Sequence, residues 1–499
     1  MSQETPQDRT QLTISPSSTI HVPECLYVDF EEGDPRDPTN FSLCRKWVIT
    51  VTACAFTCIV ASAADSFSMG YQSMIRDLNC TEFEATVALS LYALGFSIVP
   101  LVTSSFSEEV GRMPLYIVSS SVFMLTEVMV ALSPNIQTVM IARALGGAFG
   151  STGATLVGGT VADIWKPQER GLPMSLFALA AVASTGLGAV IASWIEANPR
   201  LEWRWIQWIH AMFTGTYFIS VLLFMQETRS SIILSRIAHK LRGETGDDKY
   251  RSKAEVEKPS LWQMTKVSCT RPIYLLLTEP AVQSFSLWIG FTWGVVYCLV
   301  ESVSPEFKLL YGFNVGETGT VFVTLILGSF IGFFANLYWQ EPMYRKNYDK
   351  KAQEARLYLP CVAALLLPIG MFIYAWTASP NIPWIVPLIG LTIFMSGAFV
   401  IYLVVFLYLA DCYGSYASSA LAGQSLSRNL SACVFPLFTP QMFAHLTFKW
   451  ATTLFALVAL GMVPIPYVLF FYGYKIRQRS RFSRMVLESE ATETQVTKS

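Results

Sequence analysis

The feature that most constrains the fold is a series of long apolar runs, each about as long as a bilayer is thick. A helix needs roughly 20 apolar residues to cross about 30 Å of hydrocarbon. Only 14% of the 499 residues are charged, against about a quarter in a soluble chain. The sequence therefore predicts an all-α membrane protein with twelve transmembrane helices, at 47–67, 84–104, 114–133, 136–160, 172–194, 205–225, 274–300, 315–338, 357–378, 384–409, 417–439 and 450–471.

The longest polar interruption separates the sixth run from the seventh and is rich in Lys, Arg, Glu and Asp. The fourth run ends in "TVADIW" and the tenth in "YLADCY", so Asp163 and Asp411 occupy the same place in two related halves. This is the layout of a transporter built from two repeats, whose substrate crosses between the halves near the midplane. The expected segments are a disordered cytosolic N-terminal tail (1–46), a six-helix half (47–225), a central cytosolic loop (226–273), a second six-helix half (274–471) and a cytosolic C-terminal tail (472–499).

Positive charge is distributed unevenly between the two sets of loops. With the N-terminus inside, the cytosolic segments hold 28 of the 35 Lys and Arg residues and the outer loops hold five. Because this bias sets the orientation of membrane proteins, we expect both termini in the cytosol. The polar N-terminal tail contains no cleavable signal peptide. No decisive retention signal is present, so we expect the protein in the plasma membrane. We also expect it to be a monomer.

The composition does not indicate a metal or cofactor site. The 10 cysteines include no CxxC pair and the four histidines are dispersed, while a net charge of −1 gives no reason to expect nucleic acid. We expect no metal, no cofactor and no enzymatic activity. A multi-span enzyme acting on lipids is a remote alternative, since it would need His, Cys or paired carboxylates at one membrane face. Asn79 lies in a glycosylation sequon but is too near the membrane for us to expect glycosylation.

The short connection "SSFSEEVGRMPLY" joins the second and third runs. Glu108 ends one span, Gly111 lets another backbone approach, and Arg112 opens the next span. Asp163 and Arg170 form a second charged set after the fourth run. We expect Arg112 to pair with Asp163, and Glu108 to face the positive N-terminus of the eleventh span, each only when the cytosolic side is closed. The alternative is that these are ordinary interfacial charges.

Ionisable residues inside the spans each cost at least roughly 2.5–3.5 kcal/mol unless they are paired or hydrated. Glu127 and Arg143 lie at a similar depth, about 10–12 Å from the outer turn between adjacent spans, so we expect them to meet. Glu127 is then a proton site, or the two form a permanent pair that only joins the third and fourth spans; we favour the permanent pair. Asp65 is either a proton site or an interfacial cap, and we favour the cap.

Arg428 lies about twelve residues into the eleventh run, close to the midplane. Gln424 is at helical spacing from it, and Tyr408 is near the end of the tenth run. We expect these three residues in the substrate cavity, where Arg428 holds an anionic or polar group or bonds to carbonyls between spans. The 13% aromatic content favours flat or amphipathic organic solutes over hydrated ions.

Several motifs resemble those of one family over nearly the whole chain. "SFSEEVGR" and "RALGGAFGS" resemble the signatures of the major facilitator superfamily. "GGTVADIWKPQERG", "EWRWIQWI", "QET", "RLYLP" and "YLADCYGSYASSALAGQSLSRN" are similar to its fungal twelve-span drug:proton antiporters, in their multidrug and polyamine transporter form. The resemblance implies the major facilitator fold, with Glu108, Arg112 and Asp163 in the cytosolic gate and Arg143 in proton coupling.

The same resemblance implies a secondary transporter that exports a drug, a secondary metabolite or an organic acid by alternating access, driven by inward proton flow. The fifth span departs from the pattern, because antiporters of the family tend to read GPxxGG where this chain reads "GAVIAS", with Ala189 for the proline and Ala192 and Ser193 for the glycines. This departure favours the alternative of an uptake carrier or uniporter for a small polar solute. The expected partners are a small-molecule substrate, protons and the lipid bilayer.

Overall fold

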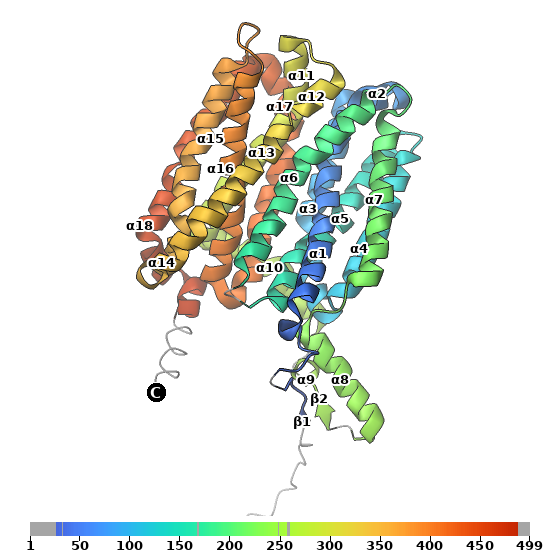
Figure 1. Ribbon diagram of the computed structural model, residues 1–499, viewed down its shortest axis with the longest axis vertical. Coiled ribbons are helices and arrows are strands. Elements are labelled where there is room, and N and C mark those ends of the chain that lie inside the picture. The colour runs from blue at the N-terminus through green and yellow to red at the C-terminus, as the bar shows by residue number, and fades with distance from the viewer. Residues whose placement is uncertain (1–25, 32, 167–168, 248, 257–259, 488–499) are drawn as a thin grey trace, which may run out of the picture.

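The computed structural model is almost entirely helical over the part of the chain that it describes. The described residues are 26–31, 33–166, 169–247, 249–256 and 260–487, with the side chains at 104, 105, 108, 254, 261 and 415 excepted. Within them the only sheet is a pair of two-residue strands. The helices form two bundles that stand side by side (Figure 1).

The N-terminal half is the bundle drawn from blue to green in Figure 1. Three of its helices begin at a residue whose side chain accepts a hydrogen bond from a backbone N–H, namely Ser42, Thr81 and Asn135, which is the usual way to start a helix. Its helices are α1 (Leu43–Met69), α2 (Tyr71–Leu78), α3 (Glu82–Glu109), α4 (Arg112–Ala131), α5 (Ile136–Ile164), α6 (Gly171–Glu196) and α7 (Glu202–Phe224).

The C-terminal half is the bundle drawn from yellow to red in Figure 1. Thr447 has φ 65° and ψ 160° and breaks α17 into two passes without a polar loop. The helices are α11 (Pro280–Tyr311), α12 (Val315–Thr320), α13 (Val323–Ala335), the π-helical turn η2 (Asn336–Gln340), α14 (Glu341–Lys351), η3 (Ala352–Leu357), α15 (Tyr358–Thr377), α16 (Ile385–Tyr413), η4 (Gly414–Tyr416), α17 (Ala417–Met462) and α18 (Pro464–Arg479).

Nine segments of the described chain are long and apolar enough to cross a membrane. Two of these, Val315–Thr377 and Ala417–Arg479, are 63 residues long, and each contains two passes, since roughly 20 residues suffice for one. The further pass is α5, whose many glycines and Arg143 make it less apolar; it packs between α3 and α4. The prediction of twelve passes in two six-helix halves is confirmed.

Successive passes alternate in direction, so the molecule has two ends (Figure 1). The first, called here the α8 end, carries β1 (Leu26–Tyr27), η1 (Pro38–Asn40), α8 (Ser230–Thr245), β2 (Tyr250–Arg251) and α9 (Lys253–Val256), with α10 (Leu261–Thr278) packed against α3 and α17 nearby. The opposite end, the α2 end, carries α2 and α12.

The described part of the N-terminal tail is ordered, contrary to expectation. β1 pairs in parallel with β2, so backbone groups of the tail bond to the central segment. A pairing of two residues with a distant strand leaves no periodic pattern in the sequence, which is why the tail was interpreted as disordered. Residues 1–25 lie outside the described chain.

The halves meet where α6 packs on α12 and α13, and where α3 packs on α17. Small residues permit this close approach. A Cβ at Gly186 would lie 2.7 Å from the carbonyl oxygen of Phe322, and one at Gly319 would overlap the side chain of Ser193. Ala189 and Ser193 of the unusual fifth span are fully buried at this contact. The altered motif therefore forms a packing surface between the halves.

Candidate functional site

A cavity of about 1200 Å³ lies between the two halves. Its deep part is lined by residues such as Tyr92, Trp293 and Arg428, and it continues to Arg112 and Asp411 at the α8 end. No described residue of α2 or α12 belongs to its lining. The cavity therefore reaches the α8 end and stops short of the α2 end.

Hydrogen bonds between the halves close the α2 end. Tyr71 donates its hydroxyl to Oε1 of Glu301 at 3.1 Å, and Trp194 donates Nε1 to Oγ1 of Thr320 at 3.1 Å. Sequence reasoning missed Glu301 because the expected seventh span stopped at residue 300, whereas α11 continues to Tyr311. The structure is therefore a state in which the cavity is open at the α8 end and closed at the α2 end. A carrier would alternate between this state and one with the α2 end open.

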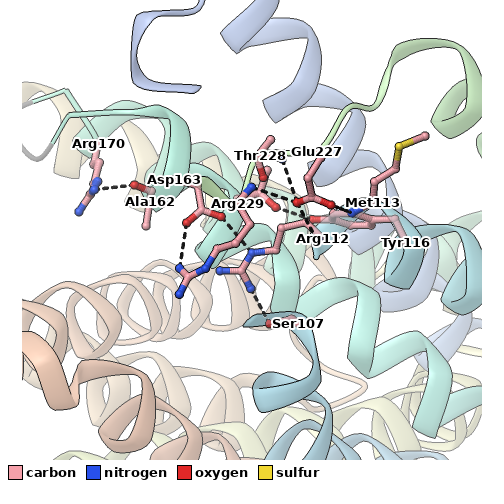
Figure 2. Close-up of polar contacts among 11 residues, drawn as sticks. Ser107, Arg112, Met113, Tyr116, Ala162, Asp163, Arg170, Glu227, Thr228 and Arg229 are labelled. Carbon is pink, nitrogen blue, oxygen red and sulfur yellow. Dashed lines mark hydrogen bonds and ion pairs between the residues drawn. The ribbon is translucent and has the colours of Figure 1, made fainter. Parts of the chain in front are cut away.

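The predicted contact between Arg112 and Asp163 is present at the α8 end (Figure 2). Nε of Arg112 donates to Oδ2 of Asp163 at 3.0 Å, and the two side chains are only 9% and 10% exposed. Nη1 of Arg112 also donates to Oγ of Ser107 at 2.7 Å, while Nη1 of Arg229 lies 3.4 Å from Oδ1 of Asp163. Removing one partner of a buried pair costs about 3–5 kcal/mol, because it leaves the other charge buried without compensation, so a change at either residue alone should be damaging.

One part of the gate prediction is wrong. The pair was expected only with this end closed, yet Arg112 lines the cavity while its bond to Asp163 is intact. Both residues belong to the N-terminal half, so their contact does not require the halves to meet. The side chain of Glu108 lies outside the described part of the chain, and its expected contact with the start of α17 remains a prediction.

Glu227, just after α7, holds the start of α4 and was missed by sequence reasoning (Figure 2). Its carboxylate accepts hydrogen bonds from the backbone N–H groups of Arg112 at 2.9 Å and Met113 at 3.3 Å. Gly111 has φ 100°, and a Cβ there would overlap this carboxylate. Gly111 therefore makes room for a side chain, not for a backbone as expected. The available signal was the "QET" motif, to which no role had been given.

The C-terminal half contains a corresponding pair of an arginine and an aspartate. Nε of Arg356 donates to Oδ2 of Asp411, which also accepts from the hydroxyl of Tyr344 at 3.4 Å. The two partners are 55 residues apart in the chain, against 51 for Arg112 and Asp163. The predicted correspondence of the two aspartates is confirmed, whereas Arg356 was missed even though it begins the "RLYLP" motif.

Arg170 lies at the mouth of the cavity, between α5 and α6. It donates Nε to the carbonyl of Trp165 at 2.8 Å and forms no ion pair with a described carboxylate. Burial lowers its pKa, while the charges of Asp163 and Asp411 act in the opposite direction. A Cβ at the adjacent Gly171 would lie 3.2 Å from Oε1 of Glu341. Arg170 is therefore within electrostatic reach of acidic groups from both halves.

The predicted contact between Arg143 and Glu127 is absent. Arg143 instead donates Nη1 to the carbonyl of Ala63 at 3.0 Å, and its guanidinium lies 4.4 Å from the ring of Phe67 and 4.1 Å from that of Tyr92. A planar guanidinium suits carbonyl acceptors and aromatic faces together. The interpretation as a permanent pair is therefore wrong for this state.

The two carboxylates near Arg143 are buried without ion pairs in the described chain. Glu127 is 2% exposed and its Oε2 has no hydrogen-bond partner; Asp65 is fully buried and neither of its oxygens has one. A cap would accept backbone N–H groups, so the cap interpretation of Asp65 fails. His210, bonded to Ser66 at 2.8 Å, lies beside this group and was not singled out from the sequence.

Of the three expected cavity residues, only Arg428 lines the cavity. Gln424 is fully buried and donates Nε2 to Oγ of Ser425 at 3.1 Å. Tyr408 packs on Phe285, away from the cavity. Both corrections have one cause: sequence position fixes the depth of a residue along a helix but not the direction in which its side chain points.

Two six-helix halves around a central cavity that reaches one face define a secondary transporter. The chain belongs to the Major Facilitator Superfamily, whose model matches residues 51–436. It is 34% identical over 461 residues to the efflux pump atB of Aspergillus terreus (91% of this chain, 88% of atB) and 32% identical over 464 residues to the multidrug transporter FLR2 of Candida glabrata (91% and 78%).

Solved structures agree on the fold. The proton:xylose symporter XylE superposes with a TM-score of 0.62 at 15% identity, over 87% of this chain and 96% of XylE. The protein is therefore a multi-pass membrane transporter of small molecules and not an enzyme.

Proposed function

We propose that this protein exports a small organic molecule from the cytosol in exchange for protons. The observation that carries the proposal is the group formed by Asp65, Glu127 and Arg143, which is buried and lacks an ion pair in the described state. Tyr92 both lines the cavity and contacts Arg143, so it joins this group to the substrate space. Unpaired ionisable groups inside a membrane protein are expensive and typically functional.

The described state then accepts substrate at the α8 end. A proton arriving from the α2 end neutralises one carboxylate and weakens its attraction for Arg143, which alters the balance between the two states. A change of about 1.4 kcal/mol shifts that balance tenfold. When the α8 end closes, Arg170 moves towards Glu341 and Asp411 and pairs with them.

The α8 end faces the cytosol in this proposal, because the loops at that end contain most of the Lys and Arg residues. Both termini are then cytosolic, and the protein works as a monomer in the plasma membrane. The names of the relatives, an efflux pump and a multidrug transporter, support the outward direction.

Deleting the gene in the source organism and comparing small molecules inside and outside the cells tests the direction. Export predicts that at least one compound accumulates in the cells and disappears from the medium. Loss of uptake with unchanged secretion would instead support a carrier for a polar solute, the alternative favoured by the altered fifth span.

The pair at the α8 end gives a charge-swap prediction. Arg112→Glu should reduce export per transporter at the membrane by about tenfold or more, because it places two buried carboxylates together. Adding Asp163→Arg should restore part of the rate, limited by the like charge of Arg229, which lies near Asp163. Lys240→Glu reverses the charge of a residue that is exposed in its pair with Glu244. It is the control and should leave export per transporter unchanged. A double variant no better than the single one would contradict the pairing.

The hydrogen bond between Tyr71 and Glu301 at the α2 end predicts how often residues near this end become accessible to solvent. Tyr71→Phe removes a hydrogen bond worth about 0.5–1.5 kcal/mol, so opening of this end should become roughly fivefold more frequent. The measurement is the rate at which an impermeant maleimide labels Ser304→Cys, which lies beside Met69 across the halves. Tyr311→Phe, which removes a bond inside one half, is the matched control. Equal labelling rates in the two variants would contradict this function of Tyr71.

A further inference from the structure

Arg428 in α17 is a buried cation without a protein counter-ion in the described chain. It is 6% exposed, and its Nε and Nη1 have no hydrogen-bond partner. A buried charge normally needs an opposite charge or several hydrogen bonds to offset the loss of water. Because Arg428 lines the cavity, a molecule entering the cavity can supply both.

The other charged groups of the described lining lie at the α8 end, and most of them are already paired. Arg112 is bonded to Asp163, and Arg345 is bonded to Glu341 at 3.2 Å. Arg356 is likewise bonded within its own half, to Asp411. The charge in the deep part of the described cavity therefore comes from Arg428.

Aromatic rings surround this cation. The guanidinium carbon of Arg428 lies 5.4 Å from the ring centre of Trp293, 5.0 Å from that of Tyr402 and 5.8 Å from that of Phe406. All three rings line the cavity, and the centres of Trp293 and Tyr402 are 5.4 Å apart. Such rings offer flat apolar surface to a ligand, while the planar guanidinium suits a carboxylate held by two parallel hydrogen bonds.

We propose that the cavity binds a planar organic anion, with the anionic group on Arg428 and the flat body against Trp293 and Tyr402. The inference names the substrate class of the transporter proposed above and rests on that function for the direction of transport, but not for binding. Arg428 repels an organic cation of the same shape, and a neutral molecule gains the ring contacts without the ion pair. Selectivity among flat solutes therefore depends on charge.

Calorimetric titration of the full chain in lipid nanodiscs tests this with three probes of one shape: 1-naphthoate, 1-naphthalenemethanol and 1-naphthylmethylammonium. We expect the anion to bind about tenfold or more tightly than the alcohol, because charge-assisted hydrogen bonds are the stronger ones. We expect the cation to bind most weakly. Equal or tighter binding of the cation, or no binding of any probe, would overturn the proposal.

Variants separate the two parts of the site. Arg428→Gln should abolish the preference for 1-naphthoate but keep binding of the alcohol, which also shows that the protein is folded. Trp293→Ala should weaken the binding of 1-naphthoate and of 1-naphthalenemethanol by the same factor. Arg345→Gln, which removes a paired cation at the cavity mouth, is the matched control. It should change neither the affinity for 1-naphthoate nor that for the alcohol. An undiminished anion preference in Arg428→Gln would contradict the proposal.

These outcomes are distinct from those that test the proposed function. Preferential binding of 1-naphthoate in a protein that shows no proton-driven transport would refute proton-coupled export while supporting the anion site. Proton-driven export of an organic cation would refute the anion site alone.

Discussion

Gly111→Ala should reduce export per transporter at the membrane by at least about tenfold. Gly111 has φ 100° and ψ 168°, a region essentially restricted to glycine, and another residue there costs about 1–3 kcal/mol. The new Cβ would also overlap the carboxylate of Glu227, which accepts from the backbone N–H groups of Arg112 and Met113. The start of α4 would then lose its cap, and the Arg112 side chain would lose its position against Asp163.

The control for this substitution lies in the second pass of α17, away from the cavity. A Cβ at Gly461 would meet nothing within 4 Å, and Gly461 does not line the cavity, so Gly461→Ala should export at the parent rate. Export is measured in whole cells and divided by the amount of protein at the membrane. A Gly111→Ala protein that reaches the membrane and exports normally would show that the Glu227 cap does not matter for transport.

Glu127→Gln should weaken the coupling of export to protons while preserving the carrier. Glu127 is 2% exposed and is not paired with Arg143 in this state, so its charge can change without breaking a permanent bond. We expect proton-driven export to fall about tenfold or more, which corresponds to roughly 1.4 kcal/mol. Exchange of labelled for unlabelled substrate, which needs no net proton movement, should continue near the parent rate.

A buried carboxylate elsewhere provides the comparison. Glu306 is also 2% exposed, but its carboxylate accepts the hydroxyl of Tyr374 in the C-terminal half. Glu306→Gln should therefore leave coupling unchanged. Asp65→Asn, measured in parallel, tells whether the second carboxylate near Arg143 carries the proton. Unchanged proton-driven transport in Glu127→Gln would remove Glu127 from the coupling mechanism.

Sequence predicted the passes and the halves because bilayer thickness imposes a length that any chain must meet. It also predicted the pair of Arg112 with Asp163, since both residues lie at helix ends on one face of the membrane. The same method misplaced Arg143, because a shared depth does not specify rotation about the helix axis. Because a helix has roughly 3.6 residues per turn, two consecutive residues at nearly the same depth point towards different neighbouring helices. Arg143 accordingly contacts carbonyls of α1 rather than Glu127.

The residues that sequence reasoning missed bond to partners that leave no local pattern. Glu227 binds backbone N–H groups more than a hundred residues earlier in the chain, and any sequence offers such groups. Tyr71 and Glu301 meet only because the two halves close at the α2 end. Contacts of this kind depend on how the halves are placed, which hydropathy does not encode.

The most direct test of proton exchange uses the purified protein in liposomes with an acidic interior. The substrate is the compound that the gene deletion identifies, added outside at the same concentration as inside. We predict that the compound accumulates inside against its gradient while protons leave, and that a protonophore abolishes the accumulation. Transport that only equalises the two concentrations and ignores both the pH gradient and the protonophore would contradict the account.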